Sequence, residues 1–227
     1  MKIVVIIPAF NEARSLPLVL HDIPTGLVAE VIVVDNNSTD ATAEVARAAG
    51  AVVVRETQRG YGKACLAGMA HAGRYNPDAI VFLDADYSDF PGEMAQLVDK
   101  LRAGFDLVIG SRIMGKAEKG ALLPHARWGN VLAVTLVKVF FGQKYTDLGP
   151  FRAIKWDKLM ALNMVDENFG WTIEMQIKAA RLGLRIAEVP VSYRKRIGVS
   201  KVSGTVSGTI RAGYKIIFTI FKQLFAA

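Results

Sequence analysis

Two aspartates separated by one residue, Asp84 and Asp86, are the strongest candidates for chemistry in this sequence. On an extended chain, residues two apart point to the same side, so both carboxylates would face one direction. Two like charges at this spacing repel each other unless a proton or a cation neutralises them. Mg²⁺ or Mn²⁺, with a shell completed by water and by the phosphates of a diphosphate ligand, is the simplest solution. A solvated turn with two unrelated acids is the alternative, because this spacing is common.

Apolar runs rich in valine and isoleucine alternate with helical patterns over the first half of the chain. The runs predict strands over residues 3–7, 30–35, 51–55, 79–84 and 106–110. Helical patterns lie between them, over about 12–22, 39–49, 61–73 and 91–103, with Thr39 as the expected N-cap of the second helix. Such alternation with short connections is typical of a mostly parallel sheet with helices on both faces. The sequence therefore predicts an α/β, Rossmann-like fold.

Polar side chains follow several of these strands, which is where ligands bind in parallel α/β sheets. Asn11 and Glu12 follow the first strand, Asp35 and Asn37 the second, Asp84 and Asp86 the fourth, and Arg112 the fifth. Because the carboxyl ends of parallel strands meet at one edge of a sheet, we expect these groups to lie together. The planar guanidinium of Arg112 suits a phosphate, and a salt bridge at the sheet edge is its alternative role.

The second half of the chain has a different pattern. Residues 115–120 predict a loop, and residues 131–141 predict an apolar helix that is too short to span a bilayer. A short strand near 151–154, helices near 155–162 and 171–182, and a last strand over about 185–191 follow.

The positive charge of the chain is concentrated at its C-terminus. The net charge is +7, and no Asp or Glu follows Glu188, whereas seven lysine and arginine residues do. Three of them, Arg211, Lys215 and Lys222, share one face of a predicted helix that is apolar over much of the rest. A basic amphipathic helix can lie in a membrane interface, and packing on the domain or on a partner subunit is the alternative.

Composition and spacing exclude several classes of protein and of site. Cys65 is the single cysteine, so no internal disulfide can form, and we expect it in the core. No run of about 18 apolar residues predicts an ordinary transmembrane helix, and the N-terminal apolar run is too short for a signal peptide. The three histidines, His21, His71 and His125, lack the spacing of metal ligands.

Seven motifs in order resemble those of the family 2 glycosyltransferases with the GT-A fold, and among them the polyprenyl-phosphate (dolichyl-type) mannose or glucose synthases. The motifs are Val5-Ile-Ile-Pro8-Ala-Phe-Asn11-Glu12, Val33-Val-Asp35-Asn-Asn-Ser38-Thr-Asp40-Ala-Thr42, Arg59-Gly-Tyr-Gly-Lys63-Ala64, Asp84-Ala-Asp86, Gly110-Ser-Arg112, Asp147-Leu-Gly-Pro-Phe-Arg152, and Glu188-Val-Pro190 with Arg196-Ile-Gly-Val-Ser200-Lys201. The resemblance implies an inverting, metal-dependent transfer of a hexose from a nucleotide-diphosphate sugar of the UDP-glucose or GDP-mannose type. It implies a polyprenyl phosphate as the acceptor.

The resemblance also implies roles for individual residues. Nucleotide-sugar binding falls to Pro8, Asn11, Glu12, Asp35, Asn37, Lys63 (or Arg59), Asp84, Ala85 and Asp86, and metal binding to Asp84, Asp86 and Ser88. The acceptor phosphate falls to Arg112, Arg152, Arg196, Ser200 and Lys201, and catalysis to Asp86, Arg112 and Asp147, with Arg152 and Glu174 as partners of Asp147. Ser88 departs from the pattern, because a Gln often stands at that position in this branch, and Asp89 lies next to it.

These assignments divide the chain by function. Residues 1–203 would form one GT-A domain, with a nucleotide-binding half (1–112) and an acceptor half (113–203), and residues 204–227 the amphipathic helix. We expect a peripheral protein on the cytoplasmic face of a membrane that does not bind nucleic acid and that could form homo-oligomers.

Three other functions compete with this hypothesis. A soluble or glycan acceptor would keep the chemistry and change the partner. A nucleotidyltransferase would carry a glycine-rich, basic signature after the first strand, which Pro8-Ala-Phe-Asn11-Glu12 lacks. A non-catalytic anion-binding module would have little use for the intact Asp84/Asp86 pair.

Overall fold

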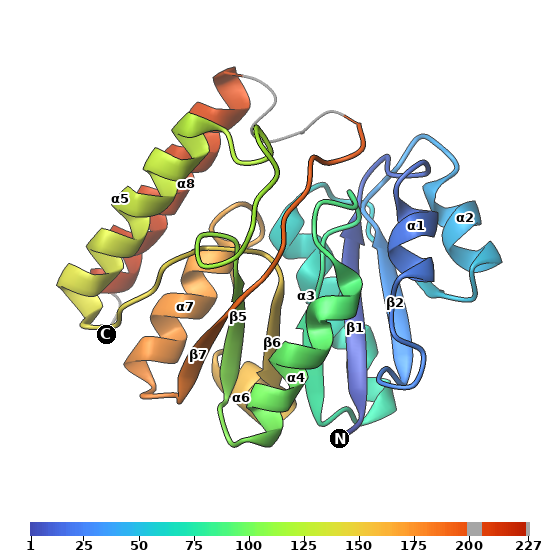
Figure 1. Cartoon of the computed structure of the whole chain (residues 1–227), viewed down its shortest axis with the longest axis horizontal. Helices are drawn as coiled ribbons and strands as arrows, with labels where there is room; N and C mark the ends of the chain where they lie inside the picture. Colours follow the sequence, from blue (N-terminus) through green and yellow to red (C-terminus); the bar gives the residue numbers. More distant parts are fainter. Residues whose placement is uncertain (199–205, 226–227) are drawn as a thin grey trace.

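A seven-stranded sheet forms the centre of the molecule, seen in a computed structural model that describes residues 1–198 and 206–225 (Figure 1). Its strand order is β3-β2-β1-β4-β6-β5-β7. The strands are β1 (Ile3–Ala9), β2 (Glu30–Asp35), β3 (Val52–Arg55), β4 (Ala79–Phe82), β5 (Leu107–Ser111), β6 (Arg152–Lys155) and β7 (Ile186–Pro190). All seven predicted strands, and the mostly parallel arrangement, are thereby confirmed.

Strand β6 is the exception to the parallel arrangement. It pairs antiparallel with β4, where Phe82 lies opposite Arg152, and antiparallel with β5, where Ile109 lies opposite Arg152. Its first residue therefore lies at the edge of the sheet where the other strands end. The segment that precedes β6 is thus delivered to the same edge as the groups that follow β1, β2, β4 and β5.

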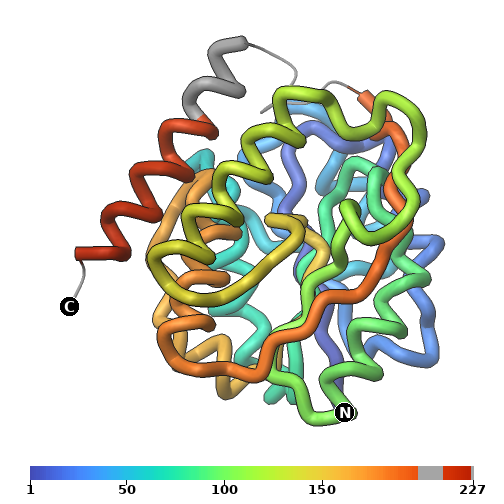
Figure 2. The backbone as a smooth tube through the Cα atoms, turned by 60° about the vertical axis from the view of Figure 1, so that its left-hand side comes forward, coloured from blue at the N-terminus to red at the C-terminus, as the bar shows by residue number. Residues whose placement is uncertain are grey.

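Helices cover both faces of the sheet, as predicted (Figures 1 and 2). One face packs against α1 (Leu16–His21), α2 (Thr42–Ala48) and α4 (Met94–Arg102), and the other against α3 (Tyr61–Ala72), α6 (Trp156–Ala161) and α7 (Trp171–Arg181). Alternate residues of β1 serve the two cores: Ile3, Val5 and Ile7 face one, and Val4 and Ile6 the other. Cys65 is a free, buried cysteine in the second core, as expected.

Two helix starts differ from the prediction. Thr39 does not cap α2, because its hydroxyl and amide bond to Asn11 instead. Ala41 stands at the N-cap and has no side-chain capping bond, while Oδ1 of Asp40 accepts hydrogen bonds from the amide (3.0 Å) and hydroxyl (2.5 Å) of Thr42, the first residue of α2. The apolar helix predicted over 131–141 begins earlier, as α5 (Pro124–Phe141), because proline suits the first turn of a helix.

The last helix, α8 (Val206–Phe225), packs along α5 and α7, and the two views show α5 and α8 side by side (Figures 1 and 2). The ring centroids of Phe140 and Phe221 are 5.7 Å apart where the helices meet. Large apolar side chains on both helices are nonetheless exposed: Trp128, Val131, Leu132, Val139 and Phe140 on α5, and Tyr214, Phe218, Phe221, Leu224 and Phe225 on α8. We call this surface the apolar face. Among the residues that the structure describes, no helix combines the length and apolar character needed to cross a membrane.

Candidate active site

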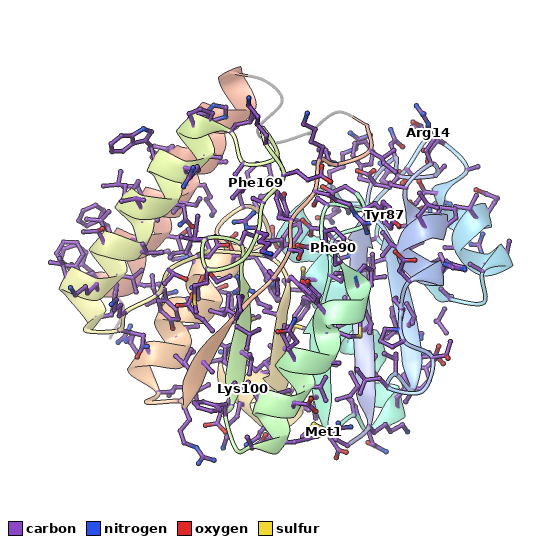
Figure 3. The ribbon with its side chains drawn as sticks, in the orientation of Figure 1. Met1, Arg14, Tyr87, Phe90, Lys100 and Phe169 are labelled. Atoms are coloured by element: carbon purple, nitrogen blue, oxygen red, sulfur yellow. The ribbon has the colours of Figure 1, made fainter. Side chains whose placement is uncertain are left out.

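A cleft of about 480 Å³ opens at the carboxyl edge of the sheet, where ligands were expected. We call it the carboxylate cleft. Its lining comes from the ends of β1 and β4, from the segments that follow β2, β3 and β7, from the start of α3 and from the loop before α7. The lining residues are Pro8, Ala9, Phe10, Glu12, Asn36, Arg59, Gly60, Tyr61, Ala64, Asp84, Ala85, Asp86, Asn168, Phe169 and Arg196. Figure 3 labels Phe169 and Tyr87 at this edge, whereas Lys100 and Met1 mark the opposite edge.

Asp84 lies just beyond β4, and its carboxylate is held by a neighbouring phenol. The hydroxyl of Tyr61 donates a hydrogen bond of 3.1 Å to Oδ1 of Asp84. Burial, and next the negative charge of Asp86, raise the pKa of Asp84 to about 7, against the opposing effects of Tyr61 and nearby arginines. This carboxyl therefore keeps its proton to a higher pH than an ordinary aspartate does, and a cation placed beside it would displace the proton.

Asp86 is buried and is held on both sides by partners. Its Oδ1 accepts hydrogen bonds from the amide (2.9 Å) and the hydroxyl (2.5 Å) of Ser88. Its Oδ2 lies 3.0 Å from Nη1 of Arg196, and the Nη2 of that arginine donates a bond of 2.9 Å to Oε1 of Glu12. Ser88 thus orients one of the two carboxylates that we predicted as metal ligands.

The chemistry of this donor set fits a divalent cation that is shared with a ligand. Burial and the neighbouring charge of Asp86 both raise the pKa of Asp84, and a bound cation would favour the ionised form of this carboxyl. Within the described residues, no group of three or more histidine, cysteine, aspartate or glutamate side chains could hold a metal ion. Such a metal would therefore take two carboxylates from the protein and the rest of its shell from water and phosphate oxygens, as Mg²⁺ commonly does.

The turns after β1 and β2 are tied to each other. Asn11, in a left-handed conformation (φ 54°), accepts a hydrogen bond of 2.8 Å from the amide of Thr39, and its own amide donates one of 3.0 Å to the hydroxyl of Ser38. Oδ1 of Asp35 also accepts from the amide of Ser38, at 3.0 Å. These contacts hold the two turns together, but neither Asn11 nor Asp35 is among the residues that line the cleft. Asn37 also has a positive φ (61°) and stands in the same turn, outside the cleft lining.

Two glycines allow a distant loop to close one end of the carboxylate cleft. A Cβ on Gly62 would lie 1.9 Å from the carbonyl oxygen of Asp166, and one on Gly60 would lie 2.3 Å from that of Glu167. Only glycine permits such an approach. The contact brings Asn168 and Phe169 into the lining of the cleft. Lys63 turns away from the cleft to pair with Glu167 (3.3 Å).

Glu174 holds this closing loop in place. Its carboxylate accepts hydrogen bonds from the amides of Val165 (3.2 Å) and Asp166 (2.8 Å), and it pairs with Lys178 at 2.8 Å. Glu174 and Lys178, four residues apart, thus form an ion pair on α7, but the carboxylate of Glu174 also shapes the loop. In this structure Glu174 does not contact Asp147.

Arg112 and Asp147 form a bidentate ion pair next to the cleft. Nε and Nη2 of Arg112 donate to the two carboxylate oxygens at 2.8 and 2.7 Å, and the amide of Arg112 donates a third bond of 2.8 Å. Burial opposes the charge of Arg112, but the fully buried Asp147 outweighs it, so the pKa of the guanidinium is raised. Glu188 fixes the backbone of this segment by accepting from the amide of Asp147 at 3.2 Å.

Arg152, which we predicted to bind the acceptor phosphate, instead holds backbone segments together. It is fully buried, and its guanidinium donates to the carbonyl oxygens of Leu148, Gly149 and Thr172. These bonds join the segment before β6 to the start of α7. Because the side chain is enclosed and committed to the backbone, we leave it out of the proposed acceptor site.

A second, basic pocket of about 370 Å³ has Arg112 in its lining. It is formed by the loop after β5 and by the first turn of α5, and its lining residues are Arg112, Ile113, Gly115, Ala117, Glu118, Lys119, Gly120, Leu122 and Arg127. We call it the basic pocket. Three of these residues are cationic against one acid, Glu118. Only Arg112 was predicted at a binding site, because Lys119, in the loop, and Arg127, in the first turn of α5, belong to no recognisable motif.

The segment after β7, residues 191–198, crosses over the loop that carries the two aspartates; we call it the crossing segment. The guanidinium of Arg194 stacks on the rings of Tyr87 (3.3 Å to the centroid) and Phe90 (4.1 Å), which Figure 3 labels. Arg196 reaches from this segment into the carboxylate cleft, and so lies on the side of the metal carboxylates and not in the basic pocket. Ser200 and Lys201 lie outside the described residues.

Asp89 is buried without a hydrogen-bond partner for either carboxylate oxygen among the described residues. Burial, and next the charges of Asp84 and Asp86, raise its pKa well above the ordinary value. Its proximity to the pair was visible in the sequence, but its isolation from donors was not. It does not join the pair in a three-carboxylate group.

Comparison with known proteins adds independent findings. Residues 4–162 match the model of glycosyl transferase family 2. The chain is 40% identical over 212 residues to an uncharacterized glycosyltransferase of Mycobacterium tuberculosis, covering 92% of this chain and 94% of the relative. It is 33% identical over 226 residues to the undecaprenyl-phosphate mannosyltransferase of Micrococcus luteus, covering 92% and 90%.

The fold also matches a solved structure. The glucosyl-3-phosphoglycerate synthase of Mycobacterium tuberculosis, in complex with Mn²⁺, UDP and glucosyl-3-phosphoglycerate, superposes with a TM-score of 0.77 at 25% identity. The match covers 100% of this chain and 81% of that one.

Proposed function

This chain belongs to glycosyl transferase family 2, and we propose that it moves a hexose from a nucleotide-diphosphate sugar to a polyprenyl phosphate. The observation that carries the proposal is the meeting of two opposite environments at Arg112. Arg112 lines the basic pocket, and its positive charge also acts on Asp84, which lines the carboxylate cleft with Asp86. A donor whose diphosphate needs a cation and an acceptor that is itself an anion suit these two neighbours.

The donor would bind in the carboxylate cleft. Asp84 and Asp86 would hold a divalent metal, which neutralises the diphosphate as it leaves. Asp35 and the turn around Asn11 would face the base, and Phe169 would close the far end of the cleft. UDP and Mn²⁺ are bound by glucosyl-3-phosphoglycerate synthase, which supports a donor of this kind.

The acceptor phosphate would bind in the basic pocket, through Arg127, Lys119 and the outer side of Arg112. A phosphate is already an anion at neutral pH, so the transfer needs no general base. Asp147 is fully buried behind Arg112, and we assign it the role of orienting that guanidinium. Arg112 would then stabilise the charge that develops between donor and acceptor during a single inverting displacement.

Two observations support a lipid as the carrier of that phosphate. The apolar face begins at the first turns of α5, the helix whose Arg127 lines the basic pocket, and α5 contains no Asp or Glu. The undecaprenyl-phosphate mannosyltransferase of Micrococcus luteus is named for a lipid-phosphate acceptor. We therefore propose that the protein works on the surface of a membrane, at its cytoplasmic face, with the isoprenoid chain along the apolar face.

A soluble phosphorylated acceptor is the second candidate, and the similarity to glucosyl-3-phosphoglycerate synthase favours it. The basic pocket would serve such an acceptor equally well, since its contacts are to the phosphate. The two candidates differ in whether the apolar face takes part in substrate binding.

Calorimetric titration tests the donor half of the proposal. UDP, GDP, UDP-glucose and GDP-mannose are titrated with Mn²⁺ or Mg²⁺, and again with EDTA, into the wild type and Asp86→Asn. One nucleotide should bind with metal, and binding should be lost in EDTA and in the variant. Nucleotide binding that is unaffected by EDTA and by Asp86→Asn would contradict a role for the metal. If no nucleotide bound, the proposed transferase activity would be contradicted.

Product analysis tests the acceptor half. The donor identified by calorimetry is incubated with undecaprenyl phosphate in detergent, with dolichyl phosphate, and with 3-phosphoglycerate. A glycosylated lipid phosphate without glycosylated phosphoglycerate is expected. The reverse result would establish the soluble acceptor.

A further inference from the structure

Arg196 bridges two buried carboxylates inside the carboxylate cleft. Its Nη1 lies 3.0 Å from Oδ2 of Asp86, and its Nη2 lies 2.9 Å from Oε1 of Glu12. Both acids are less than a tenth exposed. A buried carboxylate needs a partner of opposite charge, and here one guanidinium serves two of them. A metal ion that bound Oδ2 of Asp86 would therefore have to displace the guanidinium of Arg196.

The guanidinium of Arg196 has unused capacity for an oxygen-rich ligand. Its Nε is buried and has no hydrogen-bond partner among the described residues. An enclosed donor without an acceptor is unfavourable, so a ligand oxygen that reaches Nε would gain a bond that the protein does not supply. A planar guanidinium also matches the paired oxygens of a phosphate better than a point charge would.

The backbone around Arg196 is anchored independently of its side chain. Two residues earlier, Arg194 is stacked on Tyr87 and donates to the carbonyl of that residue at 2.6 Å. One residue later, the amide of Ile197 donates to the carbonyl of Asp86 at 3.0 Å. With both sides tied to the aspartate loop, Arg196 can change partners by rotation of its side chain alone.

We propose that Arg196 is a displaceable counter-ion: it neutralises Asp86 until the metal and the donor diphosphate enter together, and then transfers to the diphosphate. This inference rests on the proposed function of the carboxylate cleft. Metal alone would have to expel the guanidinium without offering it a new partner. Nucleoside diphosphate offers that partner, so each ligand should raise the affinity for the other by the same factor.

Mn²⁺ titrations followed by electron paramagnetic resonance test this role without any turnover. The Kd of Mn²⁺ is measured alone and with saturating UDP or GDP, whichever the wild type binds, for the wild type, Arg196→Ala and Arg196→Gln. Lys195→Ala is the control, because it removes one positive charge from the adjacent, exposed position of the same segment. Circular dichroism verifies that each variant is folded, and the glutamine variant retains a polar side chain near both carboxylates.

Both Arg196 variants should bind Mn²⁺ alone at least about fivefold more tightly than the wild type, and the gain in affinity on adding nucleotide should shrink by a similar factor. Lys195→Ala should match the wild type in both quantities. Unchanged or weaker Mn²⁺ binding by the Arg196 variants, with full nucleotide coupling, would overturn the displacement role and leave the proposed function standing. A wild type that binds neither Mn²⁺ nor nucleotide would overturn the proposed function and this inference with it.

Discussion

At the scale of single residues, the electrostatics of the site centre on Asp84. Burial, and next the negative charge of Asp86, raise the pKa of its carboxyl to about 7, although the hydrogen bond from the phenol of Tyr61 acts in the opposite direction. When no cation is bound, the two carboxylates therefore destabilise the fold most at alkaline pH, where both are ionised. This destabilisation can be measured without knowledge of the substrate.

We predict that Asp84→Asn stabilises the protein in EDTA, increasingly so as pH rises. An acid whose folded pKa is raised keeps a proton that the unfolded chain releases. Wild-type stability therefore falls from about pH 4, where the unfolded carboxyl ionises, to about pH 7, where the folded one does. Asparagine cannot ionise and avoids this loss. The measurement is the difference in Tm between variant and wild type at pH 5 and pH 8.

The exposed Asp99 provides the control for this prediction, since Asp99→Asn should show little change of that difference with pH. Saturating Mn²⁺ at pH 8 should raise the Tm of the wild type and leave that of Asp84→Asn nearly unchanged. A stability difference that is the same at both pH values would contradict a raised pKa for Asp84.

We predict that Arg127→Ala weakens the acceptor and spares the donor. Arg127 lines the basic pocket but is absent from the carboxylate cleft. A charged hydrogen bond to phosphate is worth about 1.5–3 kcal/mol, so the KM for polyprenyl phosphate should rise on the order of tenfold or more while the Kd of the nucleotide is unchanged. Lys138→Ala, on the same helix but outside the pocket, is the matched control. A loss of nucleotide binding in Arg127→Ala would refute this division of the two sites.

Residue types and spacing predicted one part of the site well and missed another. Pro8, Glu12, Ala85 and the two aspartates were expected at the site and do line the cleft, because they lie at or shortly after the carboxyl ends of β1 and β4. Asn168 and Phe169 were missed, since they arrive from a loop about a hundred residues further along the chain. The only local signal for that approach was the pair Gly60 and Gly62, which a distant backbone requires to be glycine.

At the scale of secondary-structure elements, α5 and α8 form a unit with two different sides. Inward residues such as Ala133, Val137 and Ile220 join the core, whereas Trp128 (75% exposed) and Phe225 (82% exposed) face outward. The sequence predicted a basic stripe on the last helix, but Lys215 pairs with Asp166 of the domain at 2.9 Å. The side chain of Arg211 lies outside the described ones. The feature that favours a membrane is thus the exposed apolar surface of both helices.

We predict that this surface binds vesicles. Wild-type protein should co-float with vesicles of phosphatidylglycerol and phosphatidylcholine, and Trp128→Ser/Phe225→Ser should reduce the bound fraction by roughly tenfold or more, since each large apolar side chain contributes about 1.5–3 kcal/mol on burial. Leu18→Ser/Leu182→Ser removes two exposed apolar side chains from elsewhere and should bind like the wild type. Equal flotation of the two variants would argue that the apolar face does not meet lipid.

At the scale of the whole molecule, the two halves that we predicted, 1–112 and 113–203, are interleaved. Strand β6 of the second half lies between β4 and β5 of the first, and contributes ladder hydrogen bonds to both. The existence of β6 could be predicted from its apolar run, but its neighbours could not. A strand pairs with partners that are far away in the chain, and the local pattern of residues does not predict which strands these are.

We predict one cooperative unfolding transition for the chain. All three tryptophans, Trp128, Trp156 and Trp171, lie after residue 112, so their fluorescence reports on the second half, whereas far-ultraviolet circular dichroism reports on both. The two signals should give the same denaturant midpoint and slope. A circular dichroism transition that is separate from the fluorescence transition would indicate that the halves unfold independently.

The ion pair between Lys215 and Asp166 has a practical consequence for work in the laboratory. Asp166 also accepts hydrogen bonds from the amides of Asn168 (2.8 Å) and Gly170 (3.1 Å), and so supports the segment that closes the carboxylate cleft. Deleting the last helix to obtain a shorter protein would remove Lys215, the ion-pair partner of Asp166, and would expose the loop before α7. Ligand affinities measured on such a shortened protein would then describe a different cleft, even though every residue that lines it had been retained.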